Sequence, residues 1–142
     1  EYIIDIHQIN LFEHRIKKLA HLSTEYTNVI LVTNQPQISM GKVSWQKVIE
    51  INGEIINRCR KLGLNISSFY ICPHHNNLGF EGEIKSLKRA CFCRKPLPGL
   101  FLEAAHNRNI DLKSSLMIGD SWRDKKAAES LQMQFQNINL FD

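Results

Sequence analysis

The side chains best suited to binding a metal ion fall into two short groups. Cys72 and His74 form the first group, and after a gap of sixteen residues Cys91 and Cys93 form the second. Three thiolates and one imidazole are enough to close a tetrahedral zinc site. Reduced, structurally idle cysteines would rarely fall in this spacing. The sequence therefore predicts a structural zinc ion held by these four residues.

Two basic residues, Arg94 and Lys95, directly follow the last predicted zinc ligand. A guanidinium can bind a phosphate through paired hydrogen bonds, and an ammonium can bind it as a point charge. A loop fixed by a metal ion could hold such a pair in place. We therefore interpret the two residues as phosphate ligands, with a solvated surface pair as the alternative.

Length and composition bound the class of protein. The chain has 142 residues, of which 43% are hydrophobic and 23% charged, and its formal net charge is +4. These values predict a single domain over 1–142, and no apolar run approaches the roughly 20 residues that span a bilayer. No signal-peptide pattern opens the chain, so we expect a cytoplasmic protein. The basic residues are dispersed, which favours a small anionic ligand over nucleic acid or membrane.

The elements that must position these residues alternate along the chain. Apolar residues at helical spacing predict amphipathic helices, and short apolar β-branched runs predict buried parallel strands. A long irregular stretch over 72–96 separates two halves of this pattern, and a bound metal would explain its length. We expect helices over 11–23, 44–62, 98–108 and around 127–131, strands over 29–32, 66–71, 116–118 and 135–140, and a helix interior made of Trp45, Val48, Ile49, Ile55, Ile56 and Cys59.

This order predicts an α/β fold of the Rossmann-like type, an open parallel sheet with helices on both faces and a zinc-binding loop. Ligands of such folds gather beyond the carboxyl ends of the strands. The residues predicted at those ends are Thr33, Asn34, Cys72 and Asp120. The predicted topology and the predicted chemistry therefore meet at one edge of the sheet.

Three of the residues near that edge suit phosphate chemistry. The Thr33 hydroxyl could hydrogen-bond a transferring phosphoryl group, although a polar strand-to-loop transition, taken alone, is the commoner explanation of such a residue. The Asp120 carboxylate could bind Mg²⁺, and Asp124, one helical turn later, could support that site. The alternative role for Asp120 is a helix N-cap, which is compatible with metal binding.

Four motifs carry a family resemblance. ILVTNQ, CPHH, CFCRKPLPG and MIGDSWRD resemble, in order and approximate spacing, motifs of small phosphatases of the haloacid dehalogenase superfamily. The resemblance runs from about Phe12 to Asp124 and is strongest to the D-glycero-D-manno-heptose 1,7-bisphosphate 7-phosphatases, with the histidinol-phosphatases as close relatives. It implies that Thr33 and Asn34 contact the phosphoryl group and that Gln35 belongs to the substrate-binding residues. Further roles that it implies are charge neutralisation by Lys95, substrate recognition by Arg94 and magnesium binding by Asp120 with support from Asp124.

Two departures from that family stand out. Its D-x-D motif, which supplies the nucleophile and the general acid and base, does not occur in the 142 residues. We expect the native protein to carry it on a strand before Glu1. Asp5 in YIIDIH is a weaker candidate nucleophile, because His7 replaces the second acid, and a non-catalytic protein is a third explanation. Ser121 stands where the heptose enzymes commonly have lysine, which leaves the substrate open.

The sequence therefore predicts a phosphoric monoester hydrolase of carbohydrate metabolism that uses Mg²⁺ for catalysis and Zn²⁺ for structure. The expected substrate is a heptose bisphosphate, with histidinol phosphate as the alternative. The alternative hypothesis, outside the enzymes, is a zinc-stabilised binding domain without turnover. We expect no nucleic-acid or membrane partner, and either a monomer or one part of a longer fusion chain.

Overall fold

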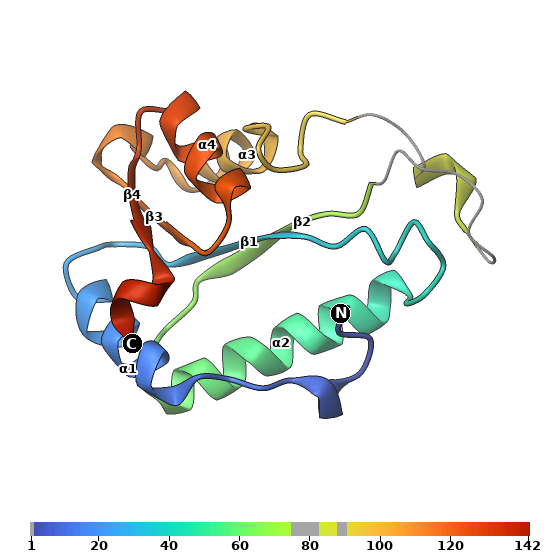
Figure 1. Ribbon diagram of the computed structural model, residues 1–142, viewed down its shortest axis with the longest axis horizontal. Coiled ribbons are helices and arrows are strands. Elements are labelled where there is room, and N and C mark those ends of the chain that lie inside the picture. The colour runs from blue at the N-terminus through green and yellow to red at the C-terminus, as the bar shows by residue number, and fades with distance from the viewer. Residues whose placement is uncertain (1, 75–82, 88–90) are drawn as a thin grey trace. The chain divides into compact units, whose positions relative to one another are not determined.

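Helices and strands alternate through the described chain. The structure is a computed structural model that describes residues 2–74, 83–87 and 91–142. Its elements follow the order α1, β1, α2, β2, α3, β3, α4, β4, with short 3-10 turns among them (Figure 1). The chain divides into two compact units, Glu1–Cys91 and Phe92–Asp142. The predicted alternation of helix and strand is thus confirmed, although part of the predicted irregular stretch lies outside the described residues.

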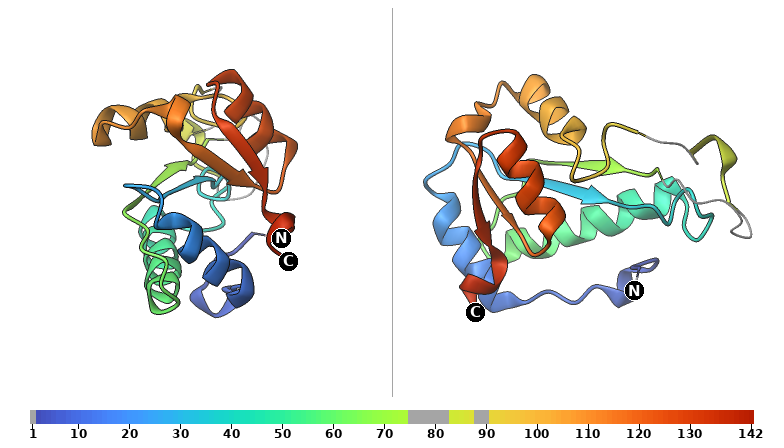
Figure 2. Two further views of the ribbon diagram at one scale, coloured as in Figure 1. Left: turned by 90° about the vertical axis from the view of Figure 1, so that its left-hand side faces the viewer. Right: turned by 45° about the horizontal axis from the view of Figure 1, so that its top comes forward.

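The first unit is built on one pair of parallel strands. Strand β1 lies beside β2, with Ile30 opposite Ser68 and Asn34 opposite Cys72. A small core of Ile38, Val43 and Val48 includes one residue of α2, and Ile71 of β2 packs against it. The elements of this unit are α1 (Glu13–Ser23), β1 (Ile30–Asn34), α2 (Trp45–Lys61) and β2 (Ser68–Cys72), and Figure 2 shows them from two further sides.

Helix α2 begins and ends as the sequence indicates. Ser44 is the N-cap, and its side chain accepts a hydrogen bond from the Lys47 N–H. Gly63 follows the helix with a φ of 93°, a left-handed conformation that glycine adopts without a Cβ clash. Both predicted boundaries are therefore confirmed to within a residue or two.

The interior of α2 differs from the prediction at two positions. Trp45 and Ile49, which we expected inside, are 49% and 51% exposed. Ile49 is turned by about 100° around the helix from the buried Val48, and Trp45 is the first residue of the helix. We included both residues in the predicted helix interior because they are apolar. The buried residues of this helix are Val48, Ile51, Asn52 and Cys59.

The second unit has its own parallel pair. Strand β3 lies beside β4, with Leu116 opposite Gln134 and Gly119 opposite Asn137. Helix α4 packs against both strands, and its Ala127 and Ala128 are fully buried. The elements are α3 (Gly99–Arg108), β3 (Leu116–Gly119), α4 (Trp122–Ser130) and β4 (Gln134–Asn137).

The last predicted strand is too long. We expected it to run to Leu140, but β4 ends at Asn137, whose side chain accepts a hydrogen bond from the Asn139 N–H. That bond caps a 3-10 turn over Ile138–Phe141. Asparagine side chains compete with strand pairing in this way, and apolar alternation does not register the competition.

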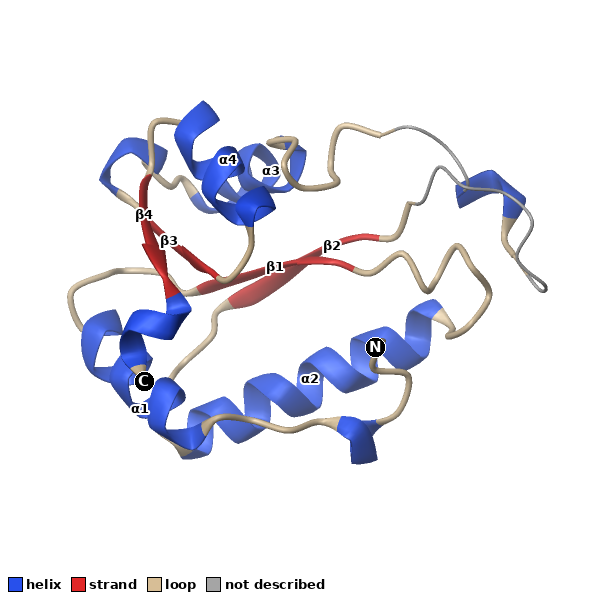
Figure 3. Cartoon of the chain, viewed as in Figure 1, coloured by secondary structure: helices blue, strands red, loops and turns tan. Residues whose placement is uncertain are grey.

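The four described strands form two parallel pairs (Figure 3). The α/β class with parallel strands is confirmed, and the described residues realise it as two sheets of two strands each. Within the described part of the chain, no helix has both the length and the apolar character needed to cross a bilayer.

Candidate active site and metal centre

The carboxyl end of the first parallel pair carries polar side chains. Thr33 and Asn34 are the last residues of β1, opposite Ile71 and Cys72 of β2. The chain then turns, and the Gln35 N–H donates a hydrogen bond of 2.8 Å to the Cys72 carbonyl. Thr33, Asn34 and Cys72 therefore lie at one sheet edge, as the sequence predicts.

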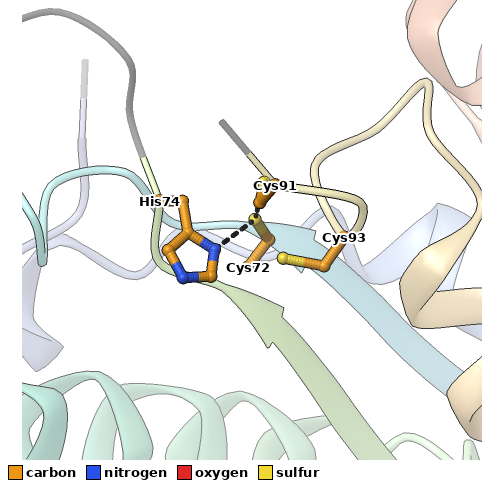
Figure 4. A group of neighbouring side chains, drawn as sticks. All are labelled: Cys72, His74, Cys91 and Cys93. Carbon is orange, nitrogen blue, oxygen red and sulfur yellow. Dashed lines mark hydrogen bonds between the residues drawn. The ribbon is translucent and has the colours of Figure 1, made fainter. Parts of the chain in front are cut away.

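A cluster of sulfur and imidazole donors lies just beyond that edge. Cys72 Sγ lies 3.6 Å from His74 Nδ1 and 3.6 Å from Cys91 Sγ (Figure 4). One ligand atom from each of Cys72, His74, Cys91 and Cys93 lies within 4.8 Å of the other three. We call these four residues the thiol–imidazole cluster. The spacing of ligands in the sequence thus does bring the four side chains together.

The geometry of the thiol–imidazole cluster suits one small ion. A tetrahedral ion about 2.3 Å from each sulfur keeps its sulfur ligands about 3.8 Å apart, close to the observed separation. Cys72 is wholly buried, and all four cysteines of the chain are reduced. Cys91 and Cys93 are partly exposed, and thiolates this close to one another would repel unless a cation lay among them. The cluster could therefore hold a metal ion, and soft sulfur donors favour zinc over magnesium.

The loop after the cluster is closed by its own backbone. The Gly99 N–H donates to the Phe92 carbonyl at 2.9 Å, and the Leu97 N–H donates to the Arg94 carbonyl at 2.9 Å. A Cβ on Gly99 would lie 2.8 Å from the Phe92 carbonyl carbon. Glycine is needed there because the start of α3 approaches the backbone of the loop closely. This fold places Arg94 and Lys95 in one tight turn.

Lys95 makes a short and well-shielded ion pair. Its Nζ lies 2.6 Å from Asp124 Oδ1. The two side chains are only 14% and 5% exposed. A buried charge needs such a partner, because its desolvation is otherwise costly. The ammonium group of Lys95 is thus held at a defined point of the second unit.

The other oxygen of Asp124 has several donors. Its Oδ2 accepts hydrogen bonds from the N–H groups of Asp120 and Ser121 and from the Ser121 hydroxyl. Ser121 and Asp124 form the capping box of α4. We call Asp120, Ser121, Asp124 and Lys95 the Lys95–Asp124 network. Both oxygens of Asp124 are engaged, so Asp124 positions its neighbours, and its support of a magnesium site stays a prediction.

Burial and hydrogen bonding act in opposite directions on Asp124. Burial raises the pKa of its carboxyl, but the hydrogen bond and charge of Lys95, followed by the bonds from Ser121, outweigh burial and hold the pKa below its ordinary value. The carboxylate is therefore ionised at neutral pH. An ionised Asp124 keeps the Lys95 ammonium in place.

Gly119 makes room for this carboxylate. A Cβ built on Gly119 would lie 2.5 Å from the Cβ and Cγ of Asp124, closer than side-chain carbons ever approach. The glycine in MIGD thus has a packing reason. It ends β3 where Asp124 folds back against the strand.

Asp120 lies at the carboxyl end of β3 and is exposed. Its predicted alternative role as N-cap is wrong, because Ser121 is the N-cap of α4 and accepts a hydrogen bond from the Asp124 N–H. The sequence signal was present, since S-x-x-D before a helix resembles the S-x-x-E capping box. The exposed Asp120 carboxylate is left at the strand end, beside a backbone fixed by Asp124.

Thr33 belongs to the first unit, whereas Lys95 and Asp120 belong to the second. Their convergence on one pocket stays a prediction. The same holds for phosphate contacts by Asn34, Gln35 and Arg94.

Asp5 does not follow a strand. It is the N-cap of a 3-10 turn over Ile6–Gln8, where its side chain accepts a hydrogen bond from the His7 N–H. That bond, opposed by slight burial and helped by the charge of Lys47 at 3.7 Å, lowers the pKa of Asp5. A carboxylate in a local cap lacks the strand-end setting of the D-x-D motif. The structure therefore gives Asp5 a capping role and no feature of a nucleophile.

Comparison with known proteins finds relatives that match most of the chain. The HAD-hydrolase-like family model matches residues 92–136. The D-glycero-beta-D-manno-heptose-1,7-bisphosphate 7-phosphatase of Vibrio cholerae is 36% identical over 129 residues, which are 91% of this chain and 67% of the relative. The D-glycero-alpha-D-manno-heptose-1,7-bisphosphate 7-phosphatase of Photorhabdus laumondii is 32% identical over 130 residues, with coverages of 87% and 67%.

A solved structure is also similar. The D,D-heptose 1,7-bisphosphate phosphatase from B. bronchiseptica, complexed with magnesium and phosphate, aligns with a TM-score of 0.74 at 24% identity and covers 94% of this chain and 69% of its own. At this identity the likeness shows a shared fold. The chain spans about two thirds of the length of the curated relatives named above.

Proposed function

Because the chain belongs to the haloacid-dehalogenase-like phosphatase family that contains the heptose-1,7-bisphosphate 7-phosphatases, we propose that it works in a magnesium-dependent phosphatase. The proposed substrate is D-glycero-D-manno-heptose 1,7-bisphosphate. The observation that carries this proposal is the Lys95 ammonium, held 2.6 Å from Asp124 next to the end of β3. A phosphomonoester brings negative charge, and a cation fixed in advance stabilises that charge without reorganisation.

We propose that Asp120 is the protein ligand of Mg²⁺. Its carboxylate is a hard oxygen donor at a strand end, exposed to solvent, and magnesium keeps several waters when bound by few protein groups. When bound, the ion would supply positive charge to the phosphate oxygens. Asp124 fixes the backbone N–H groups of Asp120 and Ser121 and thereby positions the ligand. The B. bronchiseptica structure with a similar fold is complexed with magnesium and phosphate, which supports a magnesium-dependent reaction.

Thr33, Asn34 and Gln35 are proposed to bind the phosphoryl group from the end of β1. The Thr33 hydroxyl and the side-chain amide groups of Asn34 and Gln35 can donate hydrogen bonds to phosphate oxygens. Arg94, next to Lys95, is proposed to bind a second anionic group of the substrate. None of these residues can accept a phosphoryl group as an aspartate does.

The nucleophile is proposed to lie in a strand that precedes Glu1 in the native protein and carries D-x-D. The burial of the described strands supports such a strand. Parallel strands in α/β proteins are normally buried on both faces, yet of all the residues in the four strands only Cys72 is buried. A further apolar strand, with the cover it brings, would bury residues of the strand pair that it joins. Thus 1–142 would be one domain without its first strand.

The thiol–imidazole cluster is proposed to hold structural zinc. Four protein donors leave no open position for substrate, so the ion would support the fold and not the chemistry. Its ligand Cys93 lies two residues before Lys95. The zinc ion would therefore fix the start of the loop that carries the Lys95 ammonium. A cytoplasmic location, where thiols stay reduced, remains our prediction.

The substrate can be tested with the full-length protein. We would measure phosphate release from heptose 1,7-bisphosphate and from histidinol phosphate, with and without added Mg²⁺. The expected result is magnesium-dependent release from the heptose. The Ser121→Lys variant, which restores the residue common in the heptose enzymes, would show whether Ser121 shifts the preference. Preferential turnover of histidinol phosphate would refute the substrate, and no turnover of either would favour a binding domain.

A further inference from the structure

Two of the cluster thiols are already close enough to react with each other. Cys72 Sγ lies 3.6 Å from Cys91 Sγ. A disulfide needs the sulfurs about 2.05 Å apart. Rotation of the two side chains would therefore have to bring the sulfur atoms about 1.5 Å closer. The two cysteines are 19 positions apart in the sequence, and the structure brings them together at the end of β2.

The two thiols differ in exposure. Cys72 is wholly buried, whereas Cys91 is partly exposed. A dissolved oxidant therefore reaches Cys91 first, while Cys72 is shielded and lies within contact of the oxidised sulfur. This pairing of an accessible thiol with a neighbouring resolving thiol is the arrangement that forms a disulfide instead of going on to sulfinic acid.

We propose that Cys72 and Cys91 of the thiol–imidazole cluster are an oxidative modification site, at which hydrogen peroxide joins the two sulfurs in a disulfide. The inference rests on the proposed zinc site for its consequence, but not for the bond. The Cys91 thiolate attacks one peroxide oxygen, giving a sulfenic acid and hydroxide. The Cys72 thiolate then attacks the Cys91 sulfur and expels a second hydroxide. Two thiolates lose two electrons in total, and one peroxide gains them.

The bond removes two of the four metal donors. His74 and Cys93 alone cannot complete a tetrahedral site, so the ion leaves. The loop over 92–99 keeps its own hydrogen bonds, and Lys95 keeps Asp124. Oxidation should thus eject the metal and leave the Lys95–Asp124 network intact.

The test uses the full-length protein, whose zinc content is first measured by elemental analysis. Hydrogen peroxide is then added, released zinc is followed with a chromogenic chelator, and remaining thiols are blocked with iodoacetamide before peptide mapping. We expect a peptide linked through Cys72 and Cys91, release of about one zinc per chain, and reversal of both by reductant plus zinc.

The matched control is Cys59→Ser. Cys59 is a buried residue of α2 and does not belong to the thiol–imidazole cluster. Burial raises the pKa of its thiol, which makes the thiol unreactive. This variant should release zinc and form the bridge as the wild type does. A Cys91–Cys93 bridge, bridges between chains, or sulfonic acid without a bridge would overturn the proposal. A Cys72–Cys91 bridge in protein without zinc would refute the zinc assignment alone.

Discussion

The thiol–imidazole cluster and the Lys95–Asp124 network are both groups of polar side chains near strand ends, yet they are held together differently. In the network every oxygen of Asp124 meets a donor from the chain itself, including Lys95 Nζ at 2.6 Å. In the cluster, sulfur and nitrogen ligand atoms lie within 4.8 Å of one another, and all are of the kind that donate electrons to a metal.

This difference separates two ways of holding polar side chains in place. The network is complete without any added component, because opposite charges and hydrogen bonds compensate for burial. The cluster, as we propose, depends on a bound ion to balance the charge of its sulfur ligands. Removing metal should therefore damage one region and spare the other. The predictions below break one region at a time.

Loss of the metal should have the largest effect. An ion present at about 1,000 times its dissociation constant stabilises the folded state by about 4 kcal/mol. We expect chelation, or His74→Ala, to lower the free energy of unfolding by at least about this amount. Thermal unfolding with and without chelator measures it. The control is His106→Ala, since His106 is an exposed residue of α3. Equal melting temperatures before and after chelation would exclude a structural ion.

Breaking the network should cost somewhat less. Asp124→Asn leaves the Lys95 ammonium buried without its ionic partner, which typically costs about 3 kcal/mol. The loss should be the same with and without chelator, because the network does not depend on the ion. Chemical denaturation of both proteins measures it. Glu129→Gln, on the exposed side of the same helix, is the control and should change stability by less than about 0.5 kcal/mol. A loss that vanishes after chelation would contradict the independence of the two regions.

Gly119→Ala tests the packing of Asp124 without changing a charge. The added methyl group would lie 2.5 Å from the Asp124 Cγ, and overpacking of this kind costs about 1 to 3 kcal/mol. Gly53→Ala is the matched control, because a Cβ there meets no atom within 4 Å and the position is inside α2. That control should stabilise the protein by about 1 kcal/mol. Denaturation curves for both variants decide it, and a Gly119→Ala variant as stable as wild type would disprove the close approach.

The smallest effect is a dependence on pH. The pKa of Asp124 is lowered from its ordinary 3.8 in the folded protein, so the network stabilises fully above that value and loses this contribution as pH falls through the folded pKa. The stability difference between wild type and Asp124→Asn should be constant from about pH 7 to 5 and shrink below about pH 3.8. Acid also releases bound metal from both proteins, so the difference isolates Asp124. A difference that stays constant to pH 2 would show that Asp124 is not the titrating group.

The two regions also differ in how far the sequence predicts them. The cluster is predicted completely, because ligand type and spacing are local and Cys72 and Cys91 bracket a single loop. The strand ends at Thr33 and Asn34 follow from apolar runs. The Lys95–Asp124 pair is not predicted, because 29 positions separate its members and no local pattern encodes that contact. Ser121 stands out in the sequence only as a departure, although its capping role is visible in S-x-x-D.

Other errors come from patterns that tertiary packing overrides. Ile49 and Trp45 fit an apolar helix face but lie exposed, while the polar Asn52 takes a buried place on the same helix. The side-chain amide nitrogen of Asn52 and the Oε1 of Gln37 are buried and have no hydrogen-bond partner among the described residues. Hydrophobicity patterns do not predict such buried polar positions, because they depend on which groups the fold brings together.

The central claim is that this chain carries the charge-stabilising part of a phosphatase site while a preceding strand carries the nucleophile. The direct measurement is phosphate release from heptose 1,7-bisphosphate with Mg²⁺, by the 142-residue chain and by the same chain joined to its native upstream segment. We predict negligible release by the first. The second should turn over and lose about 100-fold in rate on Lys95→Ala. Strong turnover by the 142 residues alone, abolished by Asp5→Asn, would contradict the account.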